Sequence, residues 1–128
     1  MRIKLIFLGI LNLTMLPHSA NAQSQGVMNQ QIAVDLKDEN ARLQNVYEKL
    51  FSSIGNTGKE KLSTAQKSWE IYRDSEADFE ADKTEGGSMR PGVLMGVKLR
   101  LTQERIILLS KELSFVKEMD KILNKKNK

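Results

Sequence analysis

Residues 91–123, which read PGVLMGVKLRLTQERIILLSKELSFVKEMDKIL, decide the fold. The large apolar residues recur at steps of three, four or seven, which is the spacing of one face of an α-helix. This apolar stripe consists of Leu94, Val97, Leu101, Leu108, Phe115, Met119 and Ile122. Alternation with a period of two, which would indicate strands, is absent. The stretch therefore predicts one long amphipathic helix that buries this stripe.

Two earlier segments have the same period. The first runs from about residue 28 to 54, with a stripe of Leu36, Leu43, Tyr47, Leu50 and Ile54. The second runs from about residue 59 to 82, with a stripe of Leu62, Ala65, Trp69, Tyr72 and Phe79 and with Glu76 in its gap. Glycine-containing breaks at 55–58 and 86–88 separate the segments. Three long helices joined by short loops pack best as an antiparallel bundle, so we expect an all-α three-helix bundle.

The N-terminus has the three parts of a secretory signal peptide. A basic start, Met1 to Lys4, precedes an apolar stretch from Leu5 to Leu16, and Ala20-Asn21-Ala22 forms an A-x-A site. The apolar stretch is short for a bilayer span, which takes about 20 residues. We expect cleavage after Ala22. This would leave a single domain, residues 23–128, in the periplasm or outside the cell without a stable membrane anchor; the alternative is a retained N-terminal anchor.

The expected mature chain has a restricted chemical inventory. The sequence contains no cysteine, and its single histidine, His18, would leave with the signal peptide. Catalytic triads, Cys-His pairs and the usual structural zinc sites all require one of these residues. A carboxylate-pair hydrolase is compatible with the remaining residues but needs a cleft, and a small bundle offers little concave surface. We therefore predict that the protein is not an enzyme and has neither catalytic residues, a metal site nor a cofactor.

The charge balance does not indicate a nucleic-acid-binding protein. The formal net charge is +4, and loss of Arg2 and Lys4 with the signal peptide lowers it by two, to +2. Basic and acidic residues are interspersed apart from a lysine-rich end, Lys121, Lys125, Lys126 and Lys128. Such an end is usually a solvated helix terminus, where cations favour the helix dipole. The acidic run from Asp74 to Glu85 is likewise typical of a solvated helix face and does not match a calcium-binding loop.

Arg105 lies on the apolar stripe of the third segment, four residues after Leu101. A charge there needs a partner or a route to solvent. Counting outward from the two loops places Arg105 opposite residues 66–70 and close to residues 47 and 48. The expected partners are Glu70 or Glu48, with Trp69 or Tyr47 as an aromatic face. A structural ion pair is one interpretation of Arg105, and a binding hot spot is the other.

The glycine pair before the third segment is the leading candidate for a contact surface. Two adjacent glycines expose backbone, and loops of this kind often carry function. We take Gly86, Gly87 and Ser88, together with Asp82 and Glu85, as the candidate partner-binding residues. The loop lacks the lysine spacing of a P-loop, so nucleotide binding is not expected. A plain inter-helix turn explains the same residues.

Five short motifs, in this order, resemble a known family. They are Met28-Asn29, Leu43-x-x-x-Tyr47-x-x-Leu50, Leu62-x-x-Ala65-Gln66-x-x-Trp69-x-x-Tyr72-Arg73-Asp74, Gly86-Gly87-Ser88 and Leu101-Thr102-x-x-Arg105. Together they resemble the DUF1311 family, the lysozyme inhibitor LprI-like domains, over nearly the whole expected mature chain. The resemblance implies a small secreted or periplasmic helical domain that inhibits a lysozyme by binding it. It also marks a set of family-motif residues: Tyr47, Gln66, Trp69, Tyr72, Arg73, Asp74, Thr102 and Arg105.

The sequence departs from this family in its cysteines. Members of the family usually carry cysteines where this chain has Gln31, Ala77 and Val97. All three are replaced together, as expected if a paired framework was lost as a unit. Loss of a disulfide typically costs about 2–5 kcal/mol, which the long apolar stripes must offset. The resemblance therefore implies a cysteine-free variant of the domain.

Two binding functions remain as alternatives. Animal lysozymes are usually cationic, so an inhibitor should present negative surface, and the stretch from Asp74 to Glu85 beside the glycine pair would supply it. The alternative is an envelope interaction or stress protein that has another partner and no lysozyme target. Retention of a lysozyme or of some other protein in a pull-down separates the two.

Overall fold

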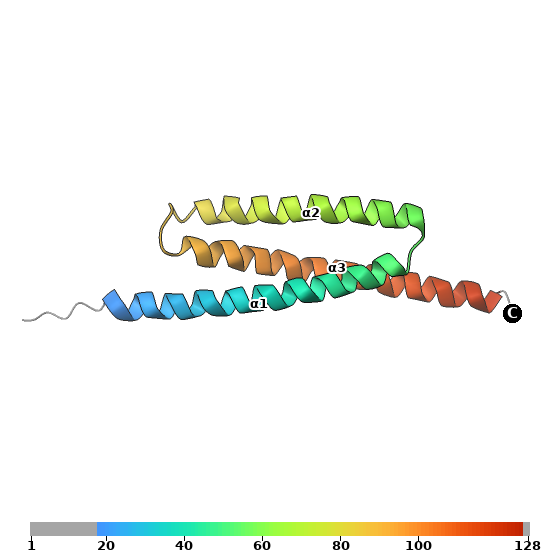
Figure 1. The fold of residues 1–128 in the computed structure, drawn as a ribbon, viewed down its shortest axis with the longest axis horizontal. Helices are drawn as coiled ribbons and strands as arrows, with labels where there is room; N and C mark the ends of the chain where they lie inside the picture. The colour runs from blue at the N-terminus through green and yellow to red at the C-terminus, as the bar shows by residue number, and fades with distance from the viewer. Residues whose placement is uncertain (1–17, 127–128) are drawn as a thin grey trace, which may run out of the picture.

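The computed structural model describes residues 18–126, which form three α-helices. Helix α1 is His18–Ser52, α2 is Asn56–Asp82 and α3 is Arg90–Lys126. The chain reverses direction at both connections, so α2 runs antiparallel to α1 and α3 (Figure 1). This confirms the all-α three-helix bundle. Each short connection contains glycine, Gly55 in the first and Gly86 and Gly87 in the second.

Helix α1 begins about ten residues earlier than the sequence predicted. It starts at His18 instead of near Met28, because residues 18–27 contain no proline and their single glycine, Gly26, is tolerated within a helix. The expected cleavage site after Ala22 falls within the first turns of α1, while residues 1–17 of the expected signal peptide lie outside the described residues. Within residues 18–126, no helix has an apolar segment long enough to cross a membrane.

Helix α3 is the central element of the bundle. It packs along both α1 and α2, whereas α1 and α2 touch each other at few points. One buried cluster joins α1 to α3 and consists of Leu43, Leu50, Ile106, Leu109 and Leu113. A second joins α2 to the N-terminal part of α3 and consists of Ala77, Val97 and Leu101. Trp69 packs against both clusters and therefore links the two parts of the core.

Only part of the stripe predicted for α2 lies in the core, since Leu62 and Trp69 pack against the buried clusters but the other two aromatic residues do not. Tyr72 is 52% exposed and Phe79 is 62% exposed. The fully buried residues of α2 are instead Ala77 and Ala81, whose small side chains allow α2 and α3 to approach closely. The prediction that Tyr72 and Phe79 belong to the core was therefore wrong, because α1 makes few contacts with α2 and leaves this side open.

The buried face of α3 changes along its length. Val97 and Leu101 are buried as predicted. Beyond them the buried residues are Thr102, Ile106, Leu109 and Leu113. The predicted continuation of the stripe is exposed, namely Leu108, Phe115, Met119 and Ile122. The seven-residue repeat fails as a core pattern here because α1 packs on a different face of α3 from the one that carries this repeat.

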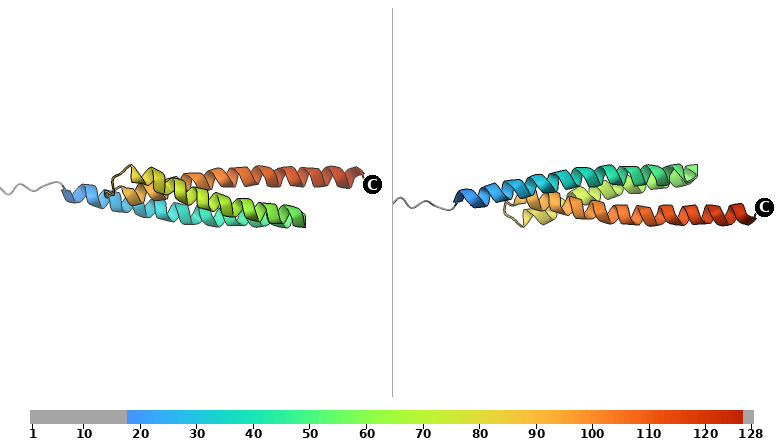
Figure 2. Two further views of the ribbon diagram at one scale, coloured as in Figure 1. Left: turned by 90° about the horizontal axis from the view of Figure 1, so that it is seen from above. Right: turned by 90° about the horizontal axis from the view of Figure 1, so that it is seen from below.

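The C-terminal part of α3 extends beyond the ends of the other two helices (Figure 2). Val116 is partly buried against the cluster shared with α1. Every residue from 117 to 126 is exposed. Lys117 still lies beside the end of α1, and the rest of this end of α3 projects without a neighbouring helix in the described part of the chain.

Candidate functional site

The connection between α2 and α3, residues 83–89, is exposed at its tip but held by backbone hydrogen bonds. The Gly87 amide donates to the Thr84 carbonyl at 3.0 Å, and the Arg90 amide donates to the Gly87 carbonyl at 3.0 Å. Residues 85–89 are all exposed. A partner that binds this loop would meet a backbone whose conformation is already restricted, which lowers the entropic cost of binding.

The tip of this loop contains two residues with left-handed backbone. Glu85 has a φ of 51° and Gly86 a φ of 72°. Glycine adopts this region freely, whereas for a residue with a side chain it costs about 1–2 kcal/mol. Nothing lies within 4 Å of the position that a Cβ on Gly86 would occupy, so glycine is favoured there by its backbone and not by lack of space. Glu85 is strained, and strain held at an exposed position is a feature that functional loops show.

Cations of α3 pair with much of the acidic run of α2. Three ion pairs join the helices: Asp78 with Arg90 at 2.6 Å, Glu80 with Arg100 at 2.7 Å and Asp74 with Lys98 at 3.2 Å. The Asp82 and Glu85 carboxylates form no hydrogen bond or ion pair within residues 18–126. Of the acids in residues 74–85, Glu76, Asp82 and Glu85 are therefore the unpaired ones within the part of the chain that the structure describes, and Asp82 and Glu85 are the two beside the loop. No group of three acidic, histidine or cysteine side chains in the described chain is placed to hold a metal ion.

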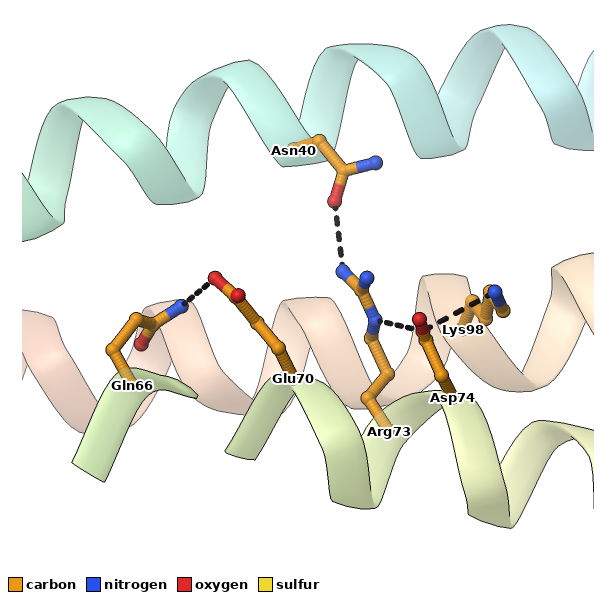
Figure 3. A network of polar contacts seen from close by, with 6 residues as sticks. All are labelled: Asn40, Gln66, Glu70, Arg73, Asp74 and Lys98. Carbon is orange, nitrogen blue, oxygen red and sulfur yellow. Dashed lines mark hydrogen bonds and ion pairs between the residues drawn. The ribbon is translucent and has the colours of Figure 1, made fainter. Parts of the chain in front are cut away.

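The Arg73-Asp74 pair of the family motif joins all three helices in the middle of the bundle (Figure 3). Arg73 Nε donates to Asp74 Oδ1 at 3.0 Å, and Arg73 Nη1 donates to Asn40 Oδ1 in α1 at 3.2 Å. Lys98 of α3 forms an ion pair with the same Asp74 oxygen. Partial burial by itself raises the pKa of Asp74, but the hydrogen bonds and positive charges of Arg73 and Lys98 outweigh it, and the pKa lies below its ordinary value.

Arg105 faces α2 at the predicted level, but its hydrogen-bond partner is an amide. Arg105 Nε donates to Gln66 Oε1 at 3.1 Å, and its guanidinium carbon lies 5.7 Å from the centre of the Trp69 ring. Gln66 is buried and donates in turn to Glu70 Oε1 at 3.3 Å. The predicted ion pair of Arg105 with Glu70 or Glu48 was therefore wrong, because Gln66 bridges Arg105 and Glu70. Burial lowers the pKa of the Arg105 guanidinium.

Most of the other family-motif residues also make contacts between or along helices. Trp69 contacts a second guanidinium, that of Arg73, at 5.1 Å from the ring centre. The Tyr47 ring stacks on Phe51 with centroids 5.7 Å apart, and Thr102 is fully buried. Tyr72 is the exception, because it is half exposed. The motif is therefore chiefly a set of packing contacts, and the exposed loop is a separate feature.

The structure does not bring the loop and the family-motif network together. Asp74, the network residue nearest the loop along α2, lies eight positions before Asp82, about 12 Å along the helix, and Gln66 lies sixteen positions before it, about 24 Å. Sequence reasoning also missed two participants in the network, Asn40 and Lys98. Neither lies on a predicted apolar stripe, so no periodic signal pointed to them.

Comparison with known families identifies the chain. A family described as Lysozyme inhibitor LprI matches residues 17–109, which include all of α2 and the loop that follows it. Comparisons with curated proteins and with solved structures gave no match. The family match spans well over half of the sequence and agrees with the motifs and with the helical fold. The chain therefore belongs to the Lysozyme inhibitor LprI family.

Proposed function

We propose that this protein is an exported inhibitor that binds a lysozyme non-covalently through the loop between α2 and α3. The contact residues would be Asp82, Glu85, Gly86, Gly87 and Ser88. Membership of the family supports the class of partner, and the matched region includes these residues. The signal-peptide pattern at the N-terminus supports export, which would bring the protein to the compartment where a lysozyme attacks the cell wall.

The conformation of Glu85 is the observation that carries this proposal. Its carboxylate is exposed and unpaired within the described residues, on a backbone held at a φ of 51°. Neighbouring Lys83 does not neutralise it, since the Lys83 ammonium lies over the Phe79 ring at 4.9 Å. A rigid loop that presents negative charge is suited to a cationic partner, because complementary charge speeds encounter and fixes orientation. A connecting turn alone would be more stable with glycine at this position.

Lysis of bacterial cells by a cationic animal lysozyme tests the proposal. The full-length gene product, purified after any processing by the producing cell, is expected to slow lysis in a dose-dependent way. Charge reversal at the loop in Asp82→Lys/Glu85→Lys is expected to reduce the inhibition by at least about tenfold, because attraction at two contacts becomes repulsion. The matched control is Glu60→Lys/Glu112→Lys, which reverses two exposed acids far from the loop, Glu60 being about 33 Å along α2 from Asp82.

A second variant separates the charge of Glu85 from its backbone strain. Glu85→Gly removes both, so it is expected to leave the free energy of unfolding unchanged or raised while weakening inhibition. Wild-type protein that does not slow lysis at about 100 µM, a concentration that would reveal even weak binding, would rule out the lysozyme function. Inhibition that is equally strong in Asp82→Lys/Glu85→Lys would leave the function in place and refute the assignment of the loop.

A further inference from the structure

The exposed face of α3 carries two parallel rows of residues at seven-residue spacing. The apolar row consists of Leu108, Phe115 and Ile122, which are 48%, 62% and 45% exposed. The charged row lies three residues further along and alternates in sign: Glu104, Lys111, Glu118 and Lys125. Residues three apart are neighbours on a helix surface, and a seven-residue repeat drifts by about 20° per repeat, so both rows run along one face. This is the pattern of a helix that pairs with another helix.

No part of the described chain covers this face. The core of this part of α3 is built by Ile106, Leu109 and Leu113. Beyond Lys117, which still lies beside the end of α1, this end of α3 projects past the other two helices, as Figure 2 shows from two sides. An isolated helical segment this short is marginally stable in water, so an apolar row on it gains from a partner. Residues 110–126 also lie beyond the matched family region, so the family description does not account for them.

The order of charges selects both the partner and its direction. If a second copy of α3 lies antiparallel, with the crossing midway between Lys111 and Glu118, Glu104 faces Lys125 of the second copy and Lys111 faces Glu118. The same arrangement brings Leu108 to within one residue of the level of Ile122, and Phe115 to within one residue of its own counterpart. In a parallel arrangement the two charged rows would fall on opposite sides of the seam, each beside the apolar row of the other copy, so their opposite charges would not meet. The recurring acids also disfavour an anionic lipid surface, which attracts runs of basic residues.

The charged row remains available for such a contact. Glu104 is 59% exposed and pairs with Arg100 at 3.3 Å, while Glu118 is 64% exposed and pairs with Lys121 at 3.4 Å. Exposed ion pairs within one helix contribute little free energy to folding, so Glu104 and Glu118 can leave them for cations of another chain at little cost. Lys111 and Lys125 are exposed as well.

We infer that two copies of this chain associate antiparallel through the face of α3 formed by Leu108, Phe115 and Ile122 with Glu104, Lys111, Glu118 and Lys125. The seam is about 32 Å long from residue 104 to residue 125. One helix face is smaller than a standard protein interface, so the dimer has a dissociation constant on the order of micromolar.

Sedimentation equilibrium of two charge variants tests this dimer. One variant, Glu104→Lys/Glu118→Lys, makes the row entirely basic, and the other, Lys111→Glu/Lys125→Glu, makes it entirely acidic. Each is expected to raise the dissociation constant for self-association by at least about tenfold, because four opposed pairs become repulsive. An equimolar mixture of the two variants is expected to restore association, because opposite charges then meet at every level.

The matched control changes the same number of lysines away from the seam. In Lys37→Glu/Lys117→Glu both substituted residues are exposed and outside the two rows, so self-association is expected to stay at the wild-type level. Far-UV circular dichroism checks that every variant keeps its helices. Wild-type protein that is monomeric up to about 100 µM overturns the proposal, as does a mixture of the two charge variants that fails to associate. A monomer that instead co-sediments with vesicles of anionic lipid would overturn it too and assign the face to a membrane.

Cysteine cross-linking tests the direction of pairing. The chain has no cysteine of its own, so introduced thiols report only the chosen positions. A mixture of Leu108→Cys and Ile122→Cys proteins is expected to form the mixed disulfide, since these positions meet in the antiparallel arrangement. In the Leu108→Cys protein alone the two thiols would lie about 21 Å apart, too far for a disulfide. Efficient oxidation of Leu108→Cys with itself would show a parallel pair and overturn the proposal.

Discussion

Arg105 of α3 donates a hydrogen bond from Nε to Oε1 of Gln66 in α2, at 3.1 Å. Gln66 is buried and passes the interaction on to Glu70, to which it donates at 3.3 Å. A neutral amide thus stands between a cation and an anion in the contact between helices. This arrangement satisfies the guanidinium without burying a carboxylate beside it, and so avoids part of the desolvation cost of a buried ion pair.

Replacement of Gln66 by leucine should destabilise the fold. Gln66→Leu keeps an apolar body of similar size but leaves Arg105 without its acceptor, so we expect the free energy of unfolding to fall by about 1.5–3 kcal/mol. Urea unfolding followed by the fluorescence of Trp69 measures the change. The control is Gln44→Leu, an exposed glutamine that bonds only to Glu48 on its own helix, for which a change within about 0.5 kcal/mol is expected. Equal effects of the two substitutions would contradict a structural role for the Arg105–Gln66 bond.

The lowered pKa of Asp74 predicts a pH dependence of stability. In the unfolded chain this carboxyl has its ordinary pKa of about 3.8, and in the folded chain the pKa is lower because Arg73 and Lys98 outweigh the effect of burial. Its stabilising contribution is therefore fully present above the unfolded value and is lost as the pH falls through the folded value. Asp74→Asn should lower the thermal midpoint near neutral pH and converge with the wild type once the pH lies below the lowered pKa of Asp74. Because the Asp74 side chain is 52% exposed, the effect is expected to be small.

Asp120→Asn is the control for this measurement. Asp120 is exposed on the projecting end of α3 and takes part in no ion pair within residues 18–126. We expect the thermal midpoint of this variant to follow that of the wild type over the whole range. A difference between wild type and Asp74→Asn that persists unchanged at low pH would show that the substitution acts through packing and not through the charge.

Two glycines of α3 should respond oppositely to substitution by alanine. A Cβ on Gly92 would lie 2.5 Å from Oδ1 of Asn29 in α1, whereas nothing lies within 4 Å of a Cβ on Gly96. Gly96→Ala should raise the free energy of unfolding by about 0.5–1 kcal/mol, because alanine favours a helix. Gly92→Ala should lower it by about 1 kcal/mol, since crowding outweighs the same gain. Both are measured by urea unfolding.

A second substitution shows whether the crowding at Gly92 is real. The Asn29 Oδ1 atom is buried and has no hydrogen-bond partner within the described residues, so Asn29→Ala alone should cost little. In the double variant Asn29→Ala/Gly92→Ala the clash is absent, and stability should return to the wild-type level or above it. A Gly92→Ala protein that is as stable as Gly96→Ala would mean that the Asn29 side chain turns aside without cost.

The sequence predicted how far along the bundle two contacting residues lie, but it did not predict which face of α3 is buried. Counting residues from the α2–α3 loop placed Arg105 opposite residues 66–70, and Gln66 is its partner, because helical rise is constant and the loop is short. The choice between the Leu108–Phe115 row and the Ile106–Leu109 pair was not predictable. Both have helical spacing, and the outcome depends on the side of α3 on which α1 packs.

For the candidate loop, too, the position was predictable from the sequence and the conformation was not. Its location between two helices and its glycine pair follow directly from the sequence, because glycines break helices. The left-handed backbone at Glu85 does not, since glutamate rarely adopts it. The pairing of Asp74, Asp78 and Glu80 with cations of α3 was also hidden, because it depends on which faces of α2 and α3 meet.

Ala77 and Val97 should accept a disulfide. The family resemblance places cysteines of relatives at these positions, and in this chain both lie in the buried cluster between α2 and α3. Ala77→Cys/Val97→Cys is therefore expected to oxidise to a bridged form. A bridge that closes a loop of about twenty residues should raise the free energy of unfolding by about 3 kcal/mol over the reduced form, measured by urea unfolding with and without reductant.

The controls for this bridge are variants that cannot form it. Each single-cysteine variant, Ala77→Cys or Val97→Cys, should give the same stability with and without reductant. Gln31, the third such position, is exposed on α1 and bonds to Asp35, so Gln31→Cys/Ala77→Cys should stay reduced. An Ala77→Cys/Val97→Cys protein that fails to oxidise, or whose free energy of unfolding does not rise on oxidation, would contradict the prediction. It would show that positions 77 and 97 are not those of a disulfide lost from this chain.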